Sequence, residues 1–244
     1  MNNLDIRKLK NIHQGKRAFF IGNGPSLRIS DLELLNDEIT FGCNKIYLAF
    51  GQTDWRPTYY SITDRLSAKT NSKTISSIPS IKLFGDTIKS SIDEEYSNFS
   101  AYWFHHISRP KDNNNNYIVK FSKDASKNTY GGHNVLYFQF QIAYYMGISE
   151  VVLLGVDFNY KLSKSTGVSA PNGEVLIGEG ETNHFHPNYR EIGEKWIKPE
   201  KEIQSHSFNL ASEHFINNGR NFLNASRYTE LEGIKRVPFD QIVG

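Results

Sequence analysis

The sequence has very little cysteine and almost no net charge. Its 244 residues include one cysteine, Cys43, which can form neither an intramolecular disulfide nor a cysteine zinc site. Packing alone must therefore hold the fold, and a reducing compartment is expected. The 28 basic and 26 acidic residues leave a formal charge of +2, and no block of lysine and arginine stands apart from acidic neighbours. This charge pattern argues against a nucleic-acid partner.

Long apolar runs are also missing. Residues 1–16 are polar and mixed in charge, without the apolar stretch of a signal peptide, so export is not expected. The longest apolar-rich stretch, 135–146, is shorter than the ~18 residues that span a bilayer, and it contains Gln139 and Gln141. We interpret it as a buried helix. A cytoplasmic protein with at most peripheral contact with the inner face of a membrane is expected.

Short β-type runs alternate with helical patterns along the chain, which is typical of the α/β class. Strands are predicted at 17–21, 39–43, 59–63, 81–84, 151–154 and 221–223, and helices at 131–146 and 200–218. The pattern predicts a single Rossmann-like domain over 1–244, with a mostly parallel sheet flanked by helices and a small lid-like region. Residues 67–124 are expected to form a variable insertion that includes an exposed asparagine loop at 113–116. Residues 161–189 are expected to form a lid loop at the active site.

Polar or glycine-rich groups follow four of the predicted strands, where ligands bind in an open parallel sheet. The first is Gly22-Asn23-Gly24-Pro25-Ser26, in which glycines permit close backbone approach to an anion and Ser26 can cap the next helix. It lacks the third glycine of a dinucleotide motif and the Gly-Lys-Ser/Thr of a P-loop. A tight strand-to-helix turn is therefore the alternative interpretation.

The remaining strand ends carry Asn44, Asp64 and Gly155-Val156-Asp157. Asn44 and Asp64 equally fit helix caps, whereas Asp157 after a buried strand fits contact with a ribose or a metal. Another candidate is the segment with Thr129, Gly131 and Gly132 at a predicted helix start, which offers a hydroxyl and amides to an anion or forms an ordinary helix cap.

His184 and His186 are the candidate acid/base residues. Imidazole titrates near neutral pH, and both histidines lie in a predicted loop. A structural or surface role is the alternative, and metal ligation by the His-x-His pair is disfavoured, so no metal site is assigned. The absence of a Gly-x-Ser-x-Gly elbow gives no support to serine hydrolysis.

Taken together, these motifs resemble the MptE-like (DUF115) family, which is named after an archaeal hydroxymethylpterin pyrophosphokinase. The resemblance rests on Phe20 to Leu27, Phe41 to Tyr47, Trp55 to Tyr60, Gly131-Gly132, Leu154 to Asp157 and His184 to Tyr189. The same order of motifs is similar to bacterial CMP-sugar-dependent sialyltransferases of the Campylobacter type.

The second resemblance implies roles for individual residues. The nucleotide would be bound by Asn23, Gly24, Ser26 and Asn44, and the donor phosphate or sugar by Thr129, Gly131 and Gly132. Gly155 and Asp157 would support the site, and His184 or His186 would deprotonate the acceptor. Asn159 stands where those enzymes have a tyrosine, so Tyr160 and Tyr189 are the candidates for stabilising the leaving group.

The leading expectation is a glycosyltransferase with a CMP-linked sugar donor and a glycan or lipid-linked acceptor, active in bacterial surface polysaccharide synthesis. No Asp-x-Asp metal motif of the usual glycosyltransferase kind is present, so no cofactor is expected. The alternative is an ATP- and Mg²⁺-dependent pterin pyrophosphokinase that uses Asp64 and Asp157 as metal ligands. A second alternative is a non-catalytic nucleotide- or glycan-binding module. The aromatic content, 13%, suits sugar stacking and homo-oligomer contacts equally.

Overall fold

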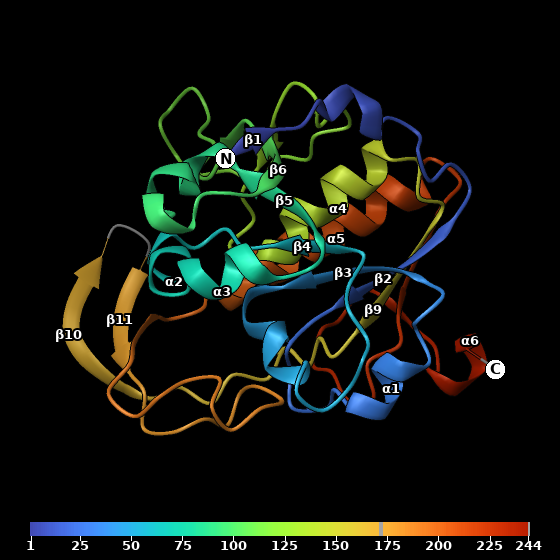
Figure 1. Ribbon diagram of the computed structural model, residues 1–244. Coiled ribbons are helices and arrows are strands. Elements are labelled where there is room, and N and C mark those ends of the chain that lie inside the picture. Colours follow the sequence, from blue (N-terminus) through green and yellow to red (C-terminus); the bar gives the residue numbers. More distant parts are fainter. Residues whose placement is uncertain (171–172, 244) are drawn as a thin grey trace.

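The computed structural model describes residues 1–170 and 173–243, and a nine-stranded sheet runs through its centre (Figure 1). Every strand pair in this sheet is parallel. In spatial order the strands are β1 (Asn2–Asn3), β6 (Ser100–Phe104), β5 (Ile81–Gly85), β4 (Tyr59–Ser61), β3 (Ile39–Cys43), β2 (Arg17–Ile21), β9 (Glu150–Leu154), β13 (Asn221–Asn224) and β14 (Lys235–Arg236). The predicted α/β class with a mostly parallel sheet is confirmed.

Helices cover both faces of the sheet. One face packs against α4 (Val135–Tyr145) and α5 (Lys201–Ile216), and the other against α1 (Ile29–Glu33), α2 (Arg65–Thr70) and α3 (Ser72–Ser77). Because side chains alternate along a strand, Phe20 and Leu153 enter the α4 side, while Phe19 and Val152 enter the other. The continuously apolar strand sequences are explained by this burial on both faces.

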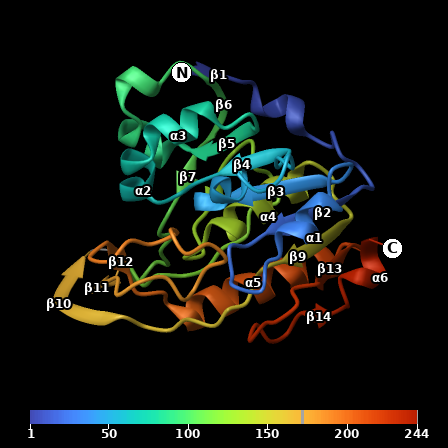
Figure 2. The same cartoon turned by 60° about the horizontal axis from the view of Figure 1, so that its bottom comes forward.

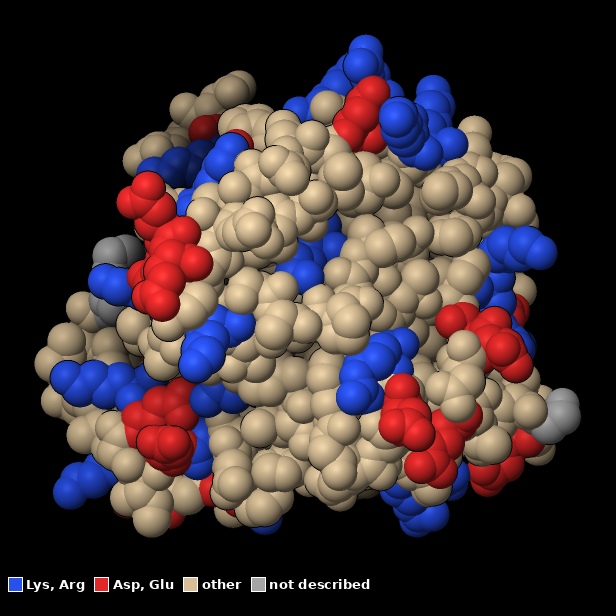
Figure 3. All heavy atoms as spheres, in the orientation of Figure 1, with Lys and Arg blue, Asp and Glu red and all other residues tan. Residues whose placement is uncertain are grey.

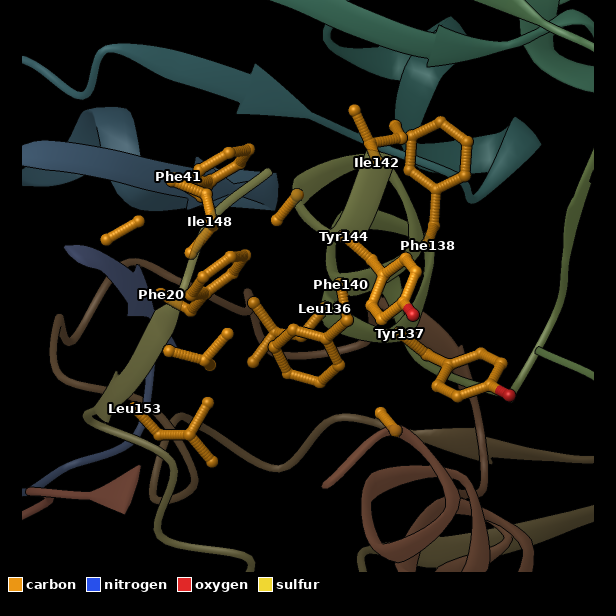
Figure 4. Close-up of a cluster of buried hydrophobic side chains, with 14 of the residues drawn as sticks. Phe20, Phe41, Leu136, Tyr137, Phe138, Phe140, Ile142, Tyr144, Ile148 and Leu153 are labelled. Carbon is orange, nitrogen blue, oxygen red and sulfur yellow. The ribbon is translucent and has the colours of Figure 1, made fainter. Parts of the chain in front are cut away.

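Helix α4 fills the middle of one core. All of its residues are buried, and Phe140 packs edge-on against Phe20 with ring centroids 5.0 Å apart (Figure 4). The helix begins at Val135, four residues after the predicted start at 131, because the Asn134 side chain accepts the N–H of Tyr137 and caps the helix. It is followed by Gly147 at φ +82°, the left-handed conformation expected of a C-terminal glycine. Among the described residues, no helix is both long and apolar enough to cross a bilayer.

Residues 67–124, expected to form an insertion, instead supply β5 and β6 to the central sheet, together with most of α2 and all of α3. Asparagines 113–116 are exposed, as predicted. The range 161–189, expected to be a lid loop, contains a hairpin of β10 (Lys164–Ala170) and β11 (Gly173–Ile177). With β12 (Lys195–Ile197) this hairpin forms a separate antiparallel sheet at one side of the molecule (Figure 2).

The remaining elements are short. They are the 3-10 helices η1 (Ile6–Leu9), η2 (Asn44–Ala49), η3 (Asp86–Ser91) and η4 (Glu94–Tyr96), the strand pair β7 (His106–Ile107) and β8 (Thr129–Tyr130), and the C-terminal α6 (Asp240–Val243).

Candidate active site at the carboxyl ends of the central strands

The strand order reverses at β2. From β2 the chain proceeds through β3, β4, β5 and β6 on one side, whereas β9 and β13 lie on the other. The carboxyl ends of the neighbouring strands β2 and β9 therefore bring the 22–26 turn beside residues 155–157. Such a reversal is where open α/β sheets bind ligands. The predicted meeting of these two segments is present.

The two segments are in backbone contact. Gly22 donates its N–H to the Leu154 carbonyl and Gly24 to the Gly155 carbonyl, each at 2.8 Å. A Cβ atom on Gly22 would overlap the Gly155 carbonyl oxygen. The glycines are thus required by the close approach of β2 and β9, and the N–H groups of Gly22 and Gly24 are already engaged within the protein.

Asp157 fastens the turn. Its two carboxylate oxygens accept the backbone N–H of Ser26 at 2.8 Å and the Ser26 hydroxyl at 2.6 Å. Burial raises the pKa of Asp157 although both bonds from Ser26 act to lower it. Ser26 therefore does not cap the next helix, since α1 begins after Arg28 without a side-chain cap. These hydrogen bonds hold the turn against a residue 131 positions later in the sequence.

Asn23 and Asn44 lie at the ends of β2 and β3. Asn23 is buried, and its Nδ2 donates to the Cys43 carbonyl at 3.1 Å. Its Oδ1 is buried and has no hydrogen-bond partner among the described residues. Asn44 adopts the left-handed φ of +50° and accepts the Tyr60 hydroxyl on its carbonyl at 2.7 Å. A buried acceptor without a partner costs about 1–3 kcal/mol, so a ligand N–H or O–H donor at Asn23 would be favoured.

Residues 184–189, here called the histidine segment, fold over these strand ends. The backbone N–H of Phe185 donates to the Asn23 carbonyl at 2.9 Å. Lys45, at the start of η2, donates from Nζ to the Tyr189 carbonyl at 2.8 Å and lies 3.1 Å from a Glu194 carboxylate oxygen. The sequence had not singled out Lys45. These contacts place residues 184–189 at the same edge of the sheet as Asn23 and Asn44.

His184 and His186 have different surroundings. The His184 ring stacks on Tyr189, with centroids 3.7 Å apart and an interplanar angle of 5°. Burial lowers the pKa of His184, although the nearby Glu181 carboxylate acts to raise it. His186 instead accepts the Asn188 N–H on Nδ1 at 3.1 Å. A neutral His186 must therefore carry its proton on Nε2, which leaves that nitrogen without a lone pair for taking a proton.

The other predicted site residues make their hydrogen bonds elsewhere. Thr129 is buried and its hydroxyl pairs with His106 Nδ1 at 3.0 Å. Gly131 donates to Ile107, and a Cβ on Gly132 would press on Tyr137 and Ser207. Tyr160 donates to Gln204 at 2.8 Å. Asp64 is exposed and caps α2 by accepting the Ser67 N–H at 2.7 Å, as the alternative interpretation had it. The described residues contain no cluster of three or more side chains suited to hold a metal.

Two hollows are lined by residues outside the 22–26 turn and residues 184–189, although the second adjoins Asp157, whose carbonyl accepts the Glu230 N–H at 2.8 Å. One, of about 510 Å³, lies between residues 117–119 and α5, and the other, of about 630 Å³, lies between Lys201 and the segment 229–236. On the face shown in Figure 3, basic and acidic side chains are intermixed without a wide area of one sign. The charge distribution on this face therefore does not mark a binding site.

Comparison with known proteins gives one family and one structure. The family model described as 6-hydroxymethylpterin diphosphokinase MptE-like matches residues 1–162. A solved structure of the MAf glycosyltransferase from Magnetospirillum magneticum AMB-1 matches with a TM-score of 0.53 and 11% sequence identity. The match covers 97% of this chain and 38% of that one. At this identity the similarity concerns the fold. A comparison with curated protein sequences finds no match.

Proposed function

The chain belongs to the MptE-like family, and we propose that it is a glycosyltransferase with a nucleotide-activated, CMP-linked sugar donor. The acceptor would be a glycan or lipid-linked saccharide of a bacterial surface polysaccharide, modified on the cytoplasmic side of the membrane. The same fold in a glycosyltransferase of low sequence identity is compatible with this proposal.

One observation carries the proposal: the histidine segment is held over the strand reversal where the two asparagines lie. Phe185 is bonded to Asn23, and Lys45, which follows Asn44, is bonded to Tyr189. An imidazole and candidate nucleotide-binding amides thus occupy one edge of the sheet. A base beside a nucleotide site is what transfer from an activated sugar to a hydroxyl requires.

The proposed reaction is a displacement at the anomeric carbon. A histidine takes the acceptor proton, the acceptor oxygen bonds to the anomeric carbon, and the bond from that carbon to the phosphate oxygen breaks, releasing CMP. Of the two histidines, His184 is favoured. Nδ1 of His186 accepts the Asn188 N–H, so a neutral His186 carries its proton on Nε2 and has no free nitrogen to take another. Burial raises the pKa of Tyr160 to about 12 and raises that of Tyr189 as well. Both phenols therefore stay protonated near neutral pH. The single O–H of Tyr160 is already donated to Gln204, so Tyr189 is the better candidate to donate to the departing phosphate.

A pterin diphosphokinase is the second candidate, because the matching family model carries that description. Such an enzyme needs carboxylates to hold Mg²⁺ with ATP. Asp157 has both oxygens engaged by Ser26, and Asp64 caps a helix. The family match also ends at residue 162, before the histidine segment. These observations place the kinase second.

A transfer assay with and without chelator tests the proposed function. Incubated with a CMP-linked sugar and a panel of saccharide acceptors, the protein should release CMP and glycosylate an acceptor. The rate of transfer in EDTA should equal the rate without EDTA within about twofold. Loss of transfer in EDTA, restored by Mg²⁺, would contradict the metal-independent chemistry. Formation of AMP from ATP with hydroxymethylpterin would favour the kinase.

A further inference from the structure

We propose that Glu181 is a positioning residue that fixes the tautomer of His184, holding the proton on Nδ1 so that Nε2 is free to take a proton. This inference rests on the proposed function only for its catalytic consequence. The orientation itself is a property of the folded protein and can be measured without substrate.

The Glu181 carboxylate and the His184 ring lie close enough to form a hydrogen bond with each other. Oε2 of Glu181 lies 2.9 Å from Nδ1 of His184, at ion-pair distance but without the alignment of a hydrogen bond. Both atoms are buried, and within the described part of the chain neither has a hydrogen-bond partner. Two buried polar atoms this close are expected to pair, because a buried donor or acceptor without a partner is costly.

The carboxylate is fixed from its other side. Oε1 of Glu181 accepts the backbone N–H of Asn183 at 2.5 Å. The side chain of Glu181 is only 1% exposed, whereas that of His184 is 18% exposed. The carboxylate is thus the inner member of the pair, and the ring is the member that reaches the surface. This arrangement suits a base in which Nε2, the ring nitrogen that faces away from Glu181, contacts the acceptor.

The surrounding charges keep Glu181 ionised. Burial acts to raise the pKa of Glu181, but His184, the Asn183 N–H and Arg190 outweigh it and hold this pKa below its ordinary value. Around His184, the charged groups are Glu181, Arg190 and Lys45, and the uncharged Tyr189 ring covers one face. A neutral imidazole beside an ionised carboxylate carries its proton on the facing nitrogen. After Nε2 takes a proton, the carboxylate stabilises the resulting imidazolium.

The test is Glu181→Gln, with Glu179→Gln as its control. The glutamine keeps an oxygen for Asn183 but turns an NH₂ toward Nδ1, which then must accept, so the ring proton moves to Nε2. Glu179 is exposed and two residues away, so its replacement removes the same charge without touching the ring. Nitrogen-15 NMR of the imidazoles distinguishes the two tautomers directly, and circular dichroism checks that both variants are folded.

In the wild type and in Glu179→Gln, His184 should be the Nδ1–H tautomer, and in Glu181→Gln the Nε2–H tautomer with a lower pKa. Turnover in Glu181→Gln should fall on the order of 10–10⁴-fold, as when an orienting carboxylate is replaced in a catalytic triad. An Nε2–H tautomer in the wild type, or no change in folded Glu181→Gln, would overturn the inference. Absence of transfer by the wild type, with the tautomers as expected, would overturn the proposed function alone.

Discussion

His184→Ala should lower turnover about 10²–10⁴-fold and leave nucleotide affinity nearly unchanged. The expected loss is that of a general base, because the acceptor hydroxyl must then give up its proton to water. His184 touches Tyr189 and Glu181, and the bond from the histidine segment to Asn23 comes from the backbone of Phe185. Removing the imidazole should therefore leave the asparagine side chains in place. Initial rates at saturating donor, with calorimetric affinities for CMP, give both quantities.

His186→Ala is the matched comparison for this prediction. It removes an imidazole two residues away, whose Nδ1 is occupied by the Asn188 N–H, so its effect on turnover should be at least tenfold smaller. Equal activity of the two variants would remove the histidine-base proposal. A larger loss in His186→Ala would assign the base to His186 and contradict the preference for His184.

Gly22→Ala should reduce the free energy of unfolding by about 3 kcal/mol, at the upper end of the usual cost of overpacking. The added methyl would overlap the carbonyl oxygen of Gly155, and a backbone atom cannot rotate away as a side chain can. Relief requires β2 and β9 to move apart at their carboxyl ends. In a chain of this size, thermal denaturation should show a fall in Tm of roughly 6–12 °C.

Gly51→Ala is the control for the glycine substitution. Gly51 is exposed, and a Cβ atom there would meet nothing within 4 Å. Its replacement should change stability by no more than about 0.5 kcal/mol. If Gly22→Ala were as stable as Gly51→Ala, the close contact between the strand ends would not constrain residue 22.

The central strands could be predicted from sequence because a strand buried on both faces is a continuous apolar run. Such a run is recognisable without knowing which strands it pairs with. The run at 17–21 and that at 151–154 match β2 and β9 within one residue. The hairpin of β10 and β11 gave no such signal, since its serines, threonine and glycine are typical of a loop. Its pairing is fixed by contacts between strands, which composition does not report.

At the site, the sequence predicted that the 22–26 turn and residues 155–157 lie together, but it did not predict the contacts that Gly22 and Ser26 make there. The two hydrogen bonds from Ser26 to Asp157 join distant parts of the chain, so no local sequence pattern predicts them. Asp157 consequently serves the turn. Glu181 did have a local signal, an acidic residue three positions before a histidine, but only folding shows that both side chains turn inward.

Calorimetric titration with CMP and with ATP plus Mg²⁺ tests the central claim, that the strand ends at Asn23 and Asn44 form a cytidine-nucleotide site. CMP should bind at least tenfold more tightly than ATP with Mg²⁺, and Asn23→Ala should weaken CMP binding at least tenfold. The exposed Asn36→Ala, whose side chain bonds only locally to Glu33, should bind CMP like the wild type. Tighter binding of ATP with Mg²⁺, or CMP affinity unaffected by a folded Asn23→Ala, would contradict the claim.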